Sequence, residues 1–150
     1  MNSTPPIPPE DAMDGIVTFF EQLSPAAVAA MDRIYAPDAR FKDPFSEVQG
    51  LAPIRRIFQH MFETLDAPRF VVTARVVQGS QCFLTWDFLF RFRSLQPDVT
   101  QTVRGASHLV LDGQGLITLH RDYWDAAEEL YEKLPVVGSL MRWLKKRASP

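Results

Sequence analysis

The sequence predicts an α+β fold, in which a mainly antiparallel sheet packs on three N-terminal helices and a helical segment follows at the C-terminus. Apolar residues recur at spacings of three and four in the first 65 residues and alternate with polar residues from about residue 70. Helices and strands separated in this way along a chain are typical of the class. A chain of 150 residues with 46% hydrophobic content can also bury one substantial core.

Two helices are expected before residue 37. Apolar side chains follow a helical period across 10–23. Ser24 followed by Pro25 is a typical N-cap with proline at the first helical position, so it opens a second helix. This helix should continue into 31–35, because Pro37 is expected to end it.

A short strand at 40–42 and a third helix at 51–65 follow, and Pro68 should end that helix. Beyond it the period changes to alternation, which predicts four strands joined by short turns. The expected strands cover 70–77, 82–93, 99–111 and 116–124.

Composition divides the chain into three parts. Residues 1–9 contain four prolines in a polar setting and predict a mobile tail. Residues 10–125 should form the domain. Residues 126–150 should form a helical extension, with one helix over 125–134 that Pro135 breaks and a second over 138–146.

The charge of the chain is small but unevenly placed. The net charge is −2, which gives no electrostatic argument for nucleic acid as a partner. Five bases and no acids follow Glu132, so this segment carries +5 and the rest carries −7. The basic segment could lie on an anionic membrane surface, but its short length favours packing of its apolar face on the sheet or on a second subunit.

Several site and location classes are not expected. Cys82 is the only cysteine, so it cannot form an internal disulfide, and its apolar surroundings predict a buried thiol. The three histidines are scattered, so neither a metal nor a cofactor is expected. The N-terminal residues lack the features of a secretory signal, and no apolar run approaches the roughly 18 residues of a membrane span. A cytoplasmic location is therefore expected.

One carboxylate, Asp43, lies in the stretch YAPDARFKDPFSEVQG that covers 35–50. Pro44 follows it and favours extended backbone at Asp43, which places the residue at the edge of an element. A carboxylate at the mouth of an apolar pocket can act as a general base, since partial burial raises its pKa while it still ionises. Alternatively, Asp43 forms a turn in which its side chain accepts hydrogen bonds from nearby backbone amides.

Two further polar side chains, His120 and Asp122, alternate onto one face of the last strand. Residues two apart on a strand are roughly 7 Å apart, which is near enough to flank a small ligand but usually too far for a direct bond. The opposite face is more apolar and includes Leu119, so burial alone would turn His120 and Asp122 to solvent. That arrangement would point Arg121 inward, which favours the cavity-facing alternative.

An aromatic stripe lies on the long strand at 82–93. It can be plain core or the lining of a cavity, and both apply if the core opens at one end. The residues expected on this inner surface are Phe58, Met61, Trp86, Phe88, Phe90 and Leu109.

In their order and spacing these segments resemble the nuclear transport factor 2-like fold, and within it the SnoaL-like polyketide cyclases and ketosteroid isomerases. The resemblance covers roughly 11–125. It rests on YAPDARFKDPFSEVQG, on GLAPIRRIF at the start of the third helix, on the hairpin GASHLVLDGQG and on the strand ITLHRDYWD. It implies a cone-shaped roll, in which a strongly curved sheet folds over the helices around a cavity, and a homodimer.

The resemblance also implies roles for individual residues. Asp43 matches the position of the general base of the isomerases, a family that is itself an established example of pKa tuning. The hydrogen-bond donors of the isomerases do not carry over, because Phe19, Phe58 and Ser107 stand in their places. These three side chains should line the pocket, but steroid isomerisation is not expected without the donors.

SnoaL-like cyclases use a histidine and an aspartate as acid/base and orienting groups, which implies such roles for His120 and Asp122, with Trp124 on the pocket wall. The resulting hypothesis is a cofactor-free isomerase or lyase that moves protons on an apolar carbonyl compound with Asp43, His120 and Asp122. The alternative is a non-catalytic dimeric module that binds a ligand or a protein. The sequence leaves open whether any reaction occurs.

Overall fold

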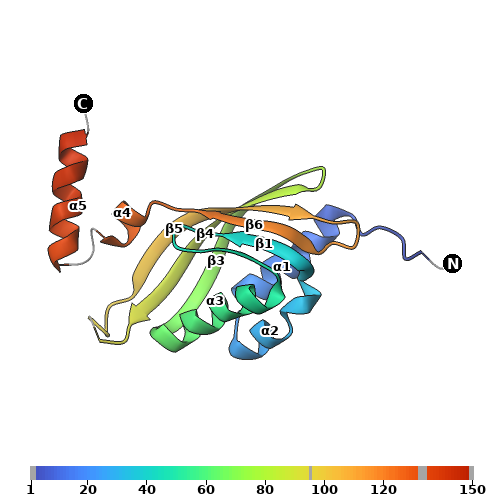
Figure 1. Ribbon diagram of the computed structural model, residues 1–150, viewed down its shortest axis with the longest axis horizontal. Coiled ribbons are helices and arrows are strands. Elements are labelled where there is room, and N and C mark those ends of the chain that lie inside the picture. The colour runs from blue at the N-terminus through green and yellow to red at the C-terminus, as the bar shows by residue number, and fades with distance from the viewer. Residues whose placement is uncertain (1–2, 95, 132–134, 149–150) are drawn as a thin grey trace.

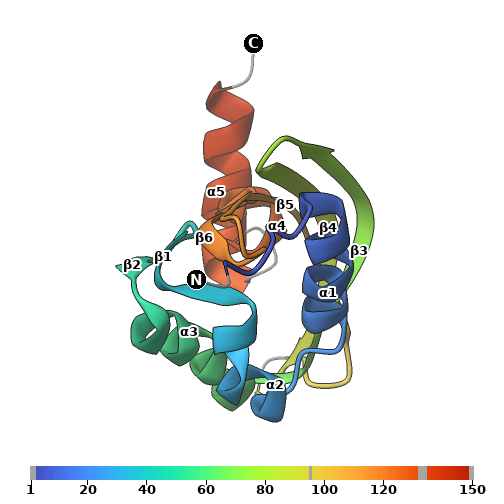
Figure 2. The ribbon, with the colours of Figure 1, turned by 90° about the vertical axis from the view of Figure 1, so that its right-hand side faces the viewer.

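The computed structural model describes residues 3–94, 96–131 and 135–148. Six strands form one strongly curved sheet in the order β2-β1-β6-β5-β4-β3, and the N-terminal helices lie against its concave side (Figures 1 and 2). Strands β1 and β6 are parallel, and the other neighbouring pairs are antiparallel. The predicted α+β class and curved, mainly antiparallel sheet are confirmed.

The helical elements are α1 (Pro9–Glu21), α2 (Pro25–Ala29), the 3-10 turn η1 (Met31–Arg33), α3 (Leu51–Thr64), α4 (Ala126–Glu129) and α5 (Pro135–Ala148). The strands are β1 (Tyr35–Lys42), β2 (Glu47–Gln49), β3 (Leu65–Gln78), β4 (Gln81–Phe92), β5 (Gln101–Leu111) and β6 (Ile117–Tyr123). The short strand β2 was not expected from the sequence.

The N-cap expected at the start of α2 is confirmed, since Ser24 Oγ accepts a hydrogen bond from the Ala27 backbone N–H at 3.1 Å. The expected continuation of this helix into 31–35 is wrong, because Tyr35 already begins β1. Pro37 therefore lies inside a strand. The register of β1 against β6 shifts between Tyr35 and Arg40, so the proline occupies an interruption of the ladder, where its missing N–H is tolerated.

The second proline expected to end a helix, Pro68, also lies in a strand. Helix α3 passes directly into β3 at Leu65, and the register of β3 against β4 shifts between Asp66 and Arg69. Strand β3 is at the edge of the sheet, which is the other setting in which a strand accepts proline. Both errors arise because a proline at a bulge and a proline after a helix look alike in sequence.

The core lies between the concave face of the sheet and helices α1 and α3. Alternate residues of β4 point into it, and Cys82, Leu84 and Trp86 are buried there. Trp86 pairs across the ladder with Gly105. A Cβ placed on Gly105 would lie 2.4 Å from the Trp86 ring, so the glycine provides the space that the indole fills.

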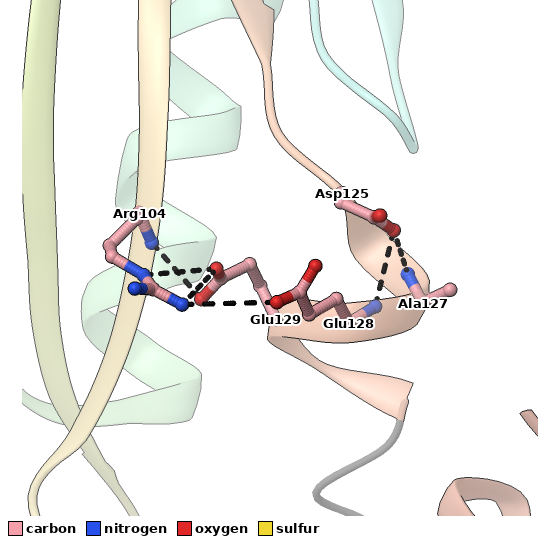
Figure 3. Close-up of polar contacts among 5 residues, drawn as sticks. All are labelled: Arg104, Asp125, Ala127, Glu128 and Glu129. Carbon is pink, nitrogen blue, oxygen red and sulfur yellow. Dashed lines mark hydrogen bonds and ion pairs between the residues drawn. The ribbon is translucent and has the colours of Figure 1, made fainter. Parts of the chain in front are cut away.

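Helix α4 covers a free edge of the sheet. Strand β6 ends opposite Ala106, which leaves the earlier part of β5 without a neighbour on that side. Glu129 on α4 is buried and accepts hydrogen bonds from the Arg104 backbone N–H and side chain, both at 3.2 Å (Figure 3). Asp125 caps the helix by accepting from the backbone amides of Ala127 and Glu128. Helix α4 ends at Glu129, with Leu130 as its C-cap, so the helix predicted over 125–134 is shorter than expected. Residues 132–134 of that prediction lie outside the described residues.

Helix α5 stands beside α4 and projects from the domain (Figures 1 and 2). Pro135 is its first residue, so the second C-terminal helix, predicted over 138–146, is present and begins at Pro135. The expected packing of its apolar face on the sheet is wrong for three described side chains, since Leu140, Trp143 and Leu144 are 55%, 50% and 45% exposed. No helix in the described part of the chain is long and apolar enough to cross a membrane.

Replacement of Gly105 by alanine should destabilise the domain by about 1–3 kcal/mol, because the new methyl group must displace the Trp86 ring. The matched control is Gly113→Ala, since Gly113 has no neighbouring atom within 4 Å of an added Cβ. The control should change the free energy of unfolding by less than about 0.5 kcal/mol. Urea unfolding at equilibrium measures both. Equal midpoints for the two variants would show that the indole is not held against the glycine.

Candidate functional site

A cavity of about 550 Å³ opens between the concave face of the sheet and α3. This volume is typical of small-molecule sites. Two carboxylates, Asp43 and Asp122, lie in a wall that is otherwise largely aromatic. The aromatic residues of the wall are Phe41, Phe45, Phe58, Phe70, Trp86, Phe88, Phe90, Phe92 and Trp124.

The structure places most of the expected pocket residues on this wall, namely Phe58, Met61, Trp86, Phe88, Phe90 and Trp124. Ser107 instead lies with His120 and Asp122 around a narrow inner space of about 20 Å³. Phe19 and Leu109 are not among the described residues that line either space. Phe20, the neighbour of Phe19 on α1, faces the inner space, and Leu109 is fully buried in the core.

A bulge in β6 settles which way its side chains point. Leu119 pairs with Val110, whereas Ile117 pairs with Leu111, so Thr118 has no paired residue in the ladder, although its hydroxyl donates to the Val110 carbonyl at 3.1 Å. The extra residue reverses the alternation, and Ile117 and His120 are both buried although they are three residues apart. The strand can therefore bury its apolar start and still turn His120 and Asp122 inward.

A continuous chain of hydrogen bonds runs from the core to the cavity. The Tyr35 hydroxyl lies 2.6 Å from His120 Nδ1, and His120 Nε2 lies 2.6 Å from Asp122 Oδ1. Ser107 donates to the same Asp122 oxygen at 2.5 Å, and Trp86 Nε1 donates to Ser107 Oγ at 2.9 Å. The expectation that His120 and Asp122 are too far apart for a direct bond is wrong, because the two side chains lean toward each other along the strand.

The environment of Tyr35 assigns the protons in this chain. Burial raises the pKa of the Tyr35 hydroxyl well above its usual value, and the nearby Asp122 carboxylate raises it further. Tyr35 therefore stays protonated and donates to Nδ1. In a neutral imidazole the remaining proton is then on Nε2, which donates to Asp122. One oxygen of Asp122 thus accepts two hydrogen bonds, from His120 and from Ser107.

Asp43 is held in a different way. Its Oδ1 accepts hydrogen bonds from the backbone N–H groups of Phe45 at 2.8 Å and Ser46 at 2.6 Å, so the turn considered from the sequence is present. The same side chain lines the cavity. Burial raises the pKa of Asp43 above its ordinary value, and the charge of Asp122 raises it further, against the lowering effect of the two amides and of His120.

Sequence reasoning missed Tyr35, whose contact with His120 joins residues 85 positions apart. It also missed the rim of the cavity. Phe45 contacts Trp124 and Tyr131 edge-on, and Leu130 lines the wall. An aromatic residue directly after the Asp43-Pro44 turn signal was the available indication of this rim. Among the described residues, no group of three or more His, Cys, Asp or Glu side chains could hold a metal ion.

The strongly curved sheet with helices on its concave side is the fold of NTF2-like proteins. A family model described as the SnoaL-like domain matches residues 16–120, and the chain belongs to this family. No curated protein matches the chain by sequence.

Solved structures agree on the fold. A protein of ketosteroid isomerase-like fold from Catenulispora acidiphila, in complex with trimethylamine, has a TM-score of 0.67 and 15% identity, covering 80% of this chain and 89% of that one. An LEH-like epoxide hydrolase of M. tuberculosis has a TM-score of 0.65 and 14% identity over 91% and 96%. An NTF2-like protein from Burkholderia thailandensis has a TM-score of 0.66 and 20% identity over 78% and 90%. At these identities the likeness concerns the fold alone.

The substitution Tyr35→Phe should cost about 1–3 kcal/mol of unfolding free energy, because it leaves the buried Nδ1 of His120 without its donor. The matched control is Tyr123→Phe, since Tyr123 is 49% exposed, and it should change stability by less than about 0.5 kcal/mol. Urea unfolding measures the cost, and ¹⁵N NMR of the imidazole reports its tautomer. A proton found on Nδ1 of His120 in the wild type would contradict the assignment.

Proposed function

We propose that the cavity binds an apolar, carbonyl-bearing small molecule and that its carboxylates transfer protons on it, without a cofactor. The observation that carries the proposal is that Asp43 and Asp122 share one aromatic cavity but are held by different partners. Two titratable groups with different environments in one pocket are a recurrent arrangement for acid–base catalysis.

Asp43 is the proposed proton carrier. Its raised pKa makes the carboxylate a stronger base once it is ionised. It also brings the pKa closer to the working pH, so the group can both take up and return a proton. In the proposed step, Asp43 takes a proton from the carbon next to the carbonyl group. The electron pair of the C–H bond moves toward the carbonyl oxygen. Asp43 then returns the proton to the same or another carbon while the carbonyl bond re-forms, as in an isomerase. In a lyase-type step the enolate instead expels a leaving group from the next carbon, and Asp43 gives the proton to that group.

Asp122 and His120 take different roles in this proposal. Asp122 lies in the cavity wall among aromatic residues and presents a carboxylate to the substrate. His120 borders the small inner space, together with Ser107. This space of about 20 Å³ is about the size that one water molecule needs, and His120 Nε2 contacts Asp122 directly, so we assign His120 to the positioning of Asp122.

Steroid isomerisation is not proposed. The Ser107 hydroxyl donates to Asp122 and is thereby directed away from a substrate oxygen. Phe58, at the place of another isomerase donor, offers only a ring to the cavity. These two positions therefore support binding of an apolar body more than stabilisation of a developing oxyanion.

The second candidate is a non-catalytic binding module. The aromatic wall supports it, because such a wall can hold an apolar ligand without any group that transfers a proton. Homodimer formation is proposed as well. The convex side of the sheet exposes Val71, Phe83 and Tyr123, and exposed apolar side chains on one face are typical of a subunit contact.

Solvent deuterium exchange tests proton transfer without knowledge of the natural substrate. Aromatic, alicyclic and steroid ketones that raise the melting temperature are incubated with the protein in D₂O, and NMR follows loss of the α-hydrogen. Asp43→Asn should lower the exchange rate about 10²–10⁴-fold and still bind, since asparagine can accept the same two backbone hydrogen bonds. Asp122→Asn should also slow exchange. Binding with no exchange in the wild type would favour the binding module, and exchange unchanged in Asp43→Asn would exclude Asp43 as carrier.

The raised pKa of Asp43 predicts a pH-dependent stability difference. The native state binds this proton more tightly than the unfolded chain, in which the pKa is about 3.9. The stabilising contribution of the protonated group is therefore complete below about pH 4 and is lost as the pH rises through the native pKa. Asp43→Asn removes the titration, so its stability relative to the wild type should increase between pH 4 and 7. Parallel urea unfolding curves at both pH values check this, and a relative decrease would contradict the direction.

A further inference from the structure

Helix α5 exposes three apolar side chains on one face, and Arg147 lies at the C-terminal end of that same face. Leu140, Trp143 and Leu144 have the i, i+3, i+4 spacing of one helical face, and all three are exposed. Lys146 and Arg147 are exposed on the same helix, and the Arg147 guanidinium lies 4.6 Å from the centre of the Trp143 ring. The sequence of α5 contains no acidic residue. An apolar face with a tryptophan, bordered by bases, is the pattern of helices that lie in the plane of a membrane surface.

We propose that α5 docks the protein on an anionic membrane surface. The apolar face would enter the boundary between headgroups and acyl chains, and the bases would contact lipid phosphates. This surface does not depend on the reaction proposed above.

Charge favours a membrane over a second copy of the helix. All five charged residues after Glu132 are bases. A symmetric contact between two α5 helices would bring these like charges together. An anionic lipid surface instead attracts each of them, and this attraction raises binding about fivefold for each base.

The position of α5 also suits a protein whose cavity takes up an apolar ligand. Helix α5 contacts α4, and the residue that follows α4, Leu130, lines the cavity. Tyr131 contacts the rim residue Phe45. A domain docked through α5 would therefore hold this side of its cavity next to the lipid phase, where apolar molecules accumulate.

Vesicle sedimentation with the full chain tests the proposal. The probes are two kinds of sucrose-loaded vesicle. One kind is phosphatidylcholine alone, and the other also contains about 30% phosphatidylglycerol, which gives it a negative surface. The wild type should bind the anionic vesicles and lose most of this binding in about 0.5 M salt, which screens the attraction.

Two double variants separate the two parts of the surface. Leu140→Ser with Leu144→Ser should lower binding at least about tenfold through loss of apolar burial. Lys146→Gln with Arg147→Gln should lower it by about 25-fold. The matched control is Val76→Ser, which removes an apolar side chain that is 61% exposed on β3, and it should bind like the wild type. Circular dichroism confirms that each variant is folded.

Three results would overturn the proposal. The first is equal binding of the wild type to both kinds of vesicle. The second is binding that neither double variant reduces. The third is a wild-type dimer, measured by light scattering, that does not bind vesicles and becomes a monomer in Leu140→Ser with Leu144→Ser. That result would identify α5 as a subunit contact.

Discussion

The residue that the ladder skips in β6 decides which side chains of this strand face the inside of the curved sheet. The ladder between β6 and β5 skips Thr118, so the strand presents Ile117 to the core and, after the bulge, His120 and Asp122 to the same side. Without the extra residue, burial of Ile117 would put His120 on the convex face. A bulge thus resolves the conflict between a strand that must bury apolar side chains and a site that needs polar ones.

Once turned inward, these polar groups must be satisfied, because a buried group without a partner costs about 1–3 kcal/mol. Tyr35 donates a hydrogen bond to His120, and His120 donates one to Asp122, so each buried group has a partner. On β5 and β4, Ser107 donates to Asp122 and Trp86 donates to Ser107. The chain also crosses from β1 to β6 and β5, so it ties the parallel pair of strands to the antiparallel part of the sheet.

The sequence predicted the elements that depend on local signals and missed those that depend on register. Hydrophobic period located the three N-terminal helices and the four long strands, and Ser24-Pro25 located a cap that is present. The interruptions of the strand ladders at Pro37, Pro68 and Thr118 could not be predicted, because a few extra residues in one strand do not change composition or average period. The resemblance to known families placed Asp43, His120 and Asp122 together, but the Tyr35 contact needs the pairing of β1 with β6.

The two carboxylates also show why a cavity can hold charge at a modest cost. Asp122 receives donors from two side chains, so its charge is compensated within the fold. Asp43 receives two backbone amides, yet burial still raises its pKa, because the aromatic wall replaces water on its open side. The charge on Asp122 adds to this effect. The acid–base behaviour of Asp43 is therefore set by the wall and by the hydrogen-bond chain behind Asp122, which makes it a property of the folded cavity.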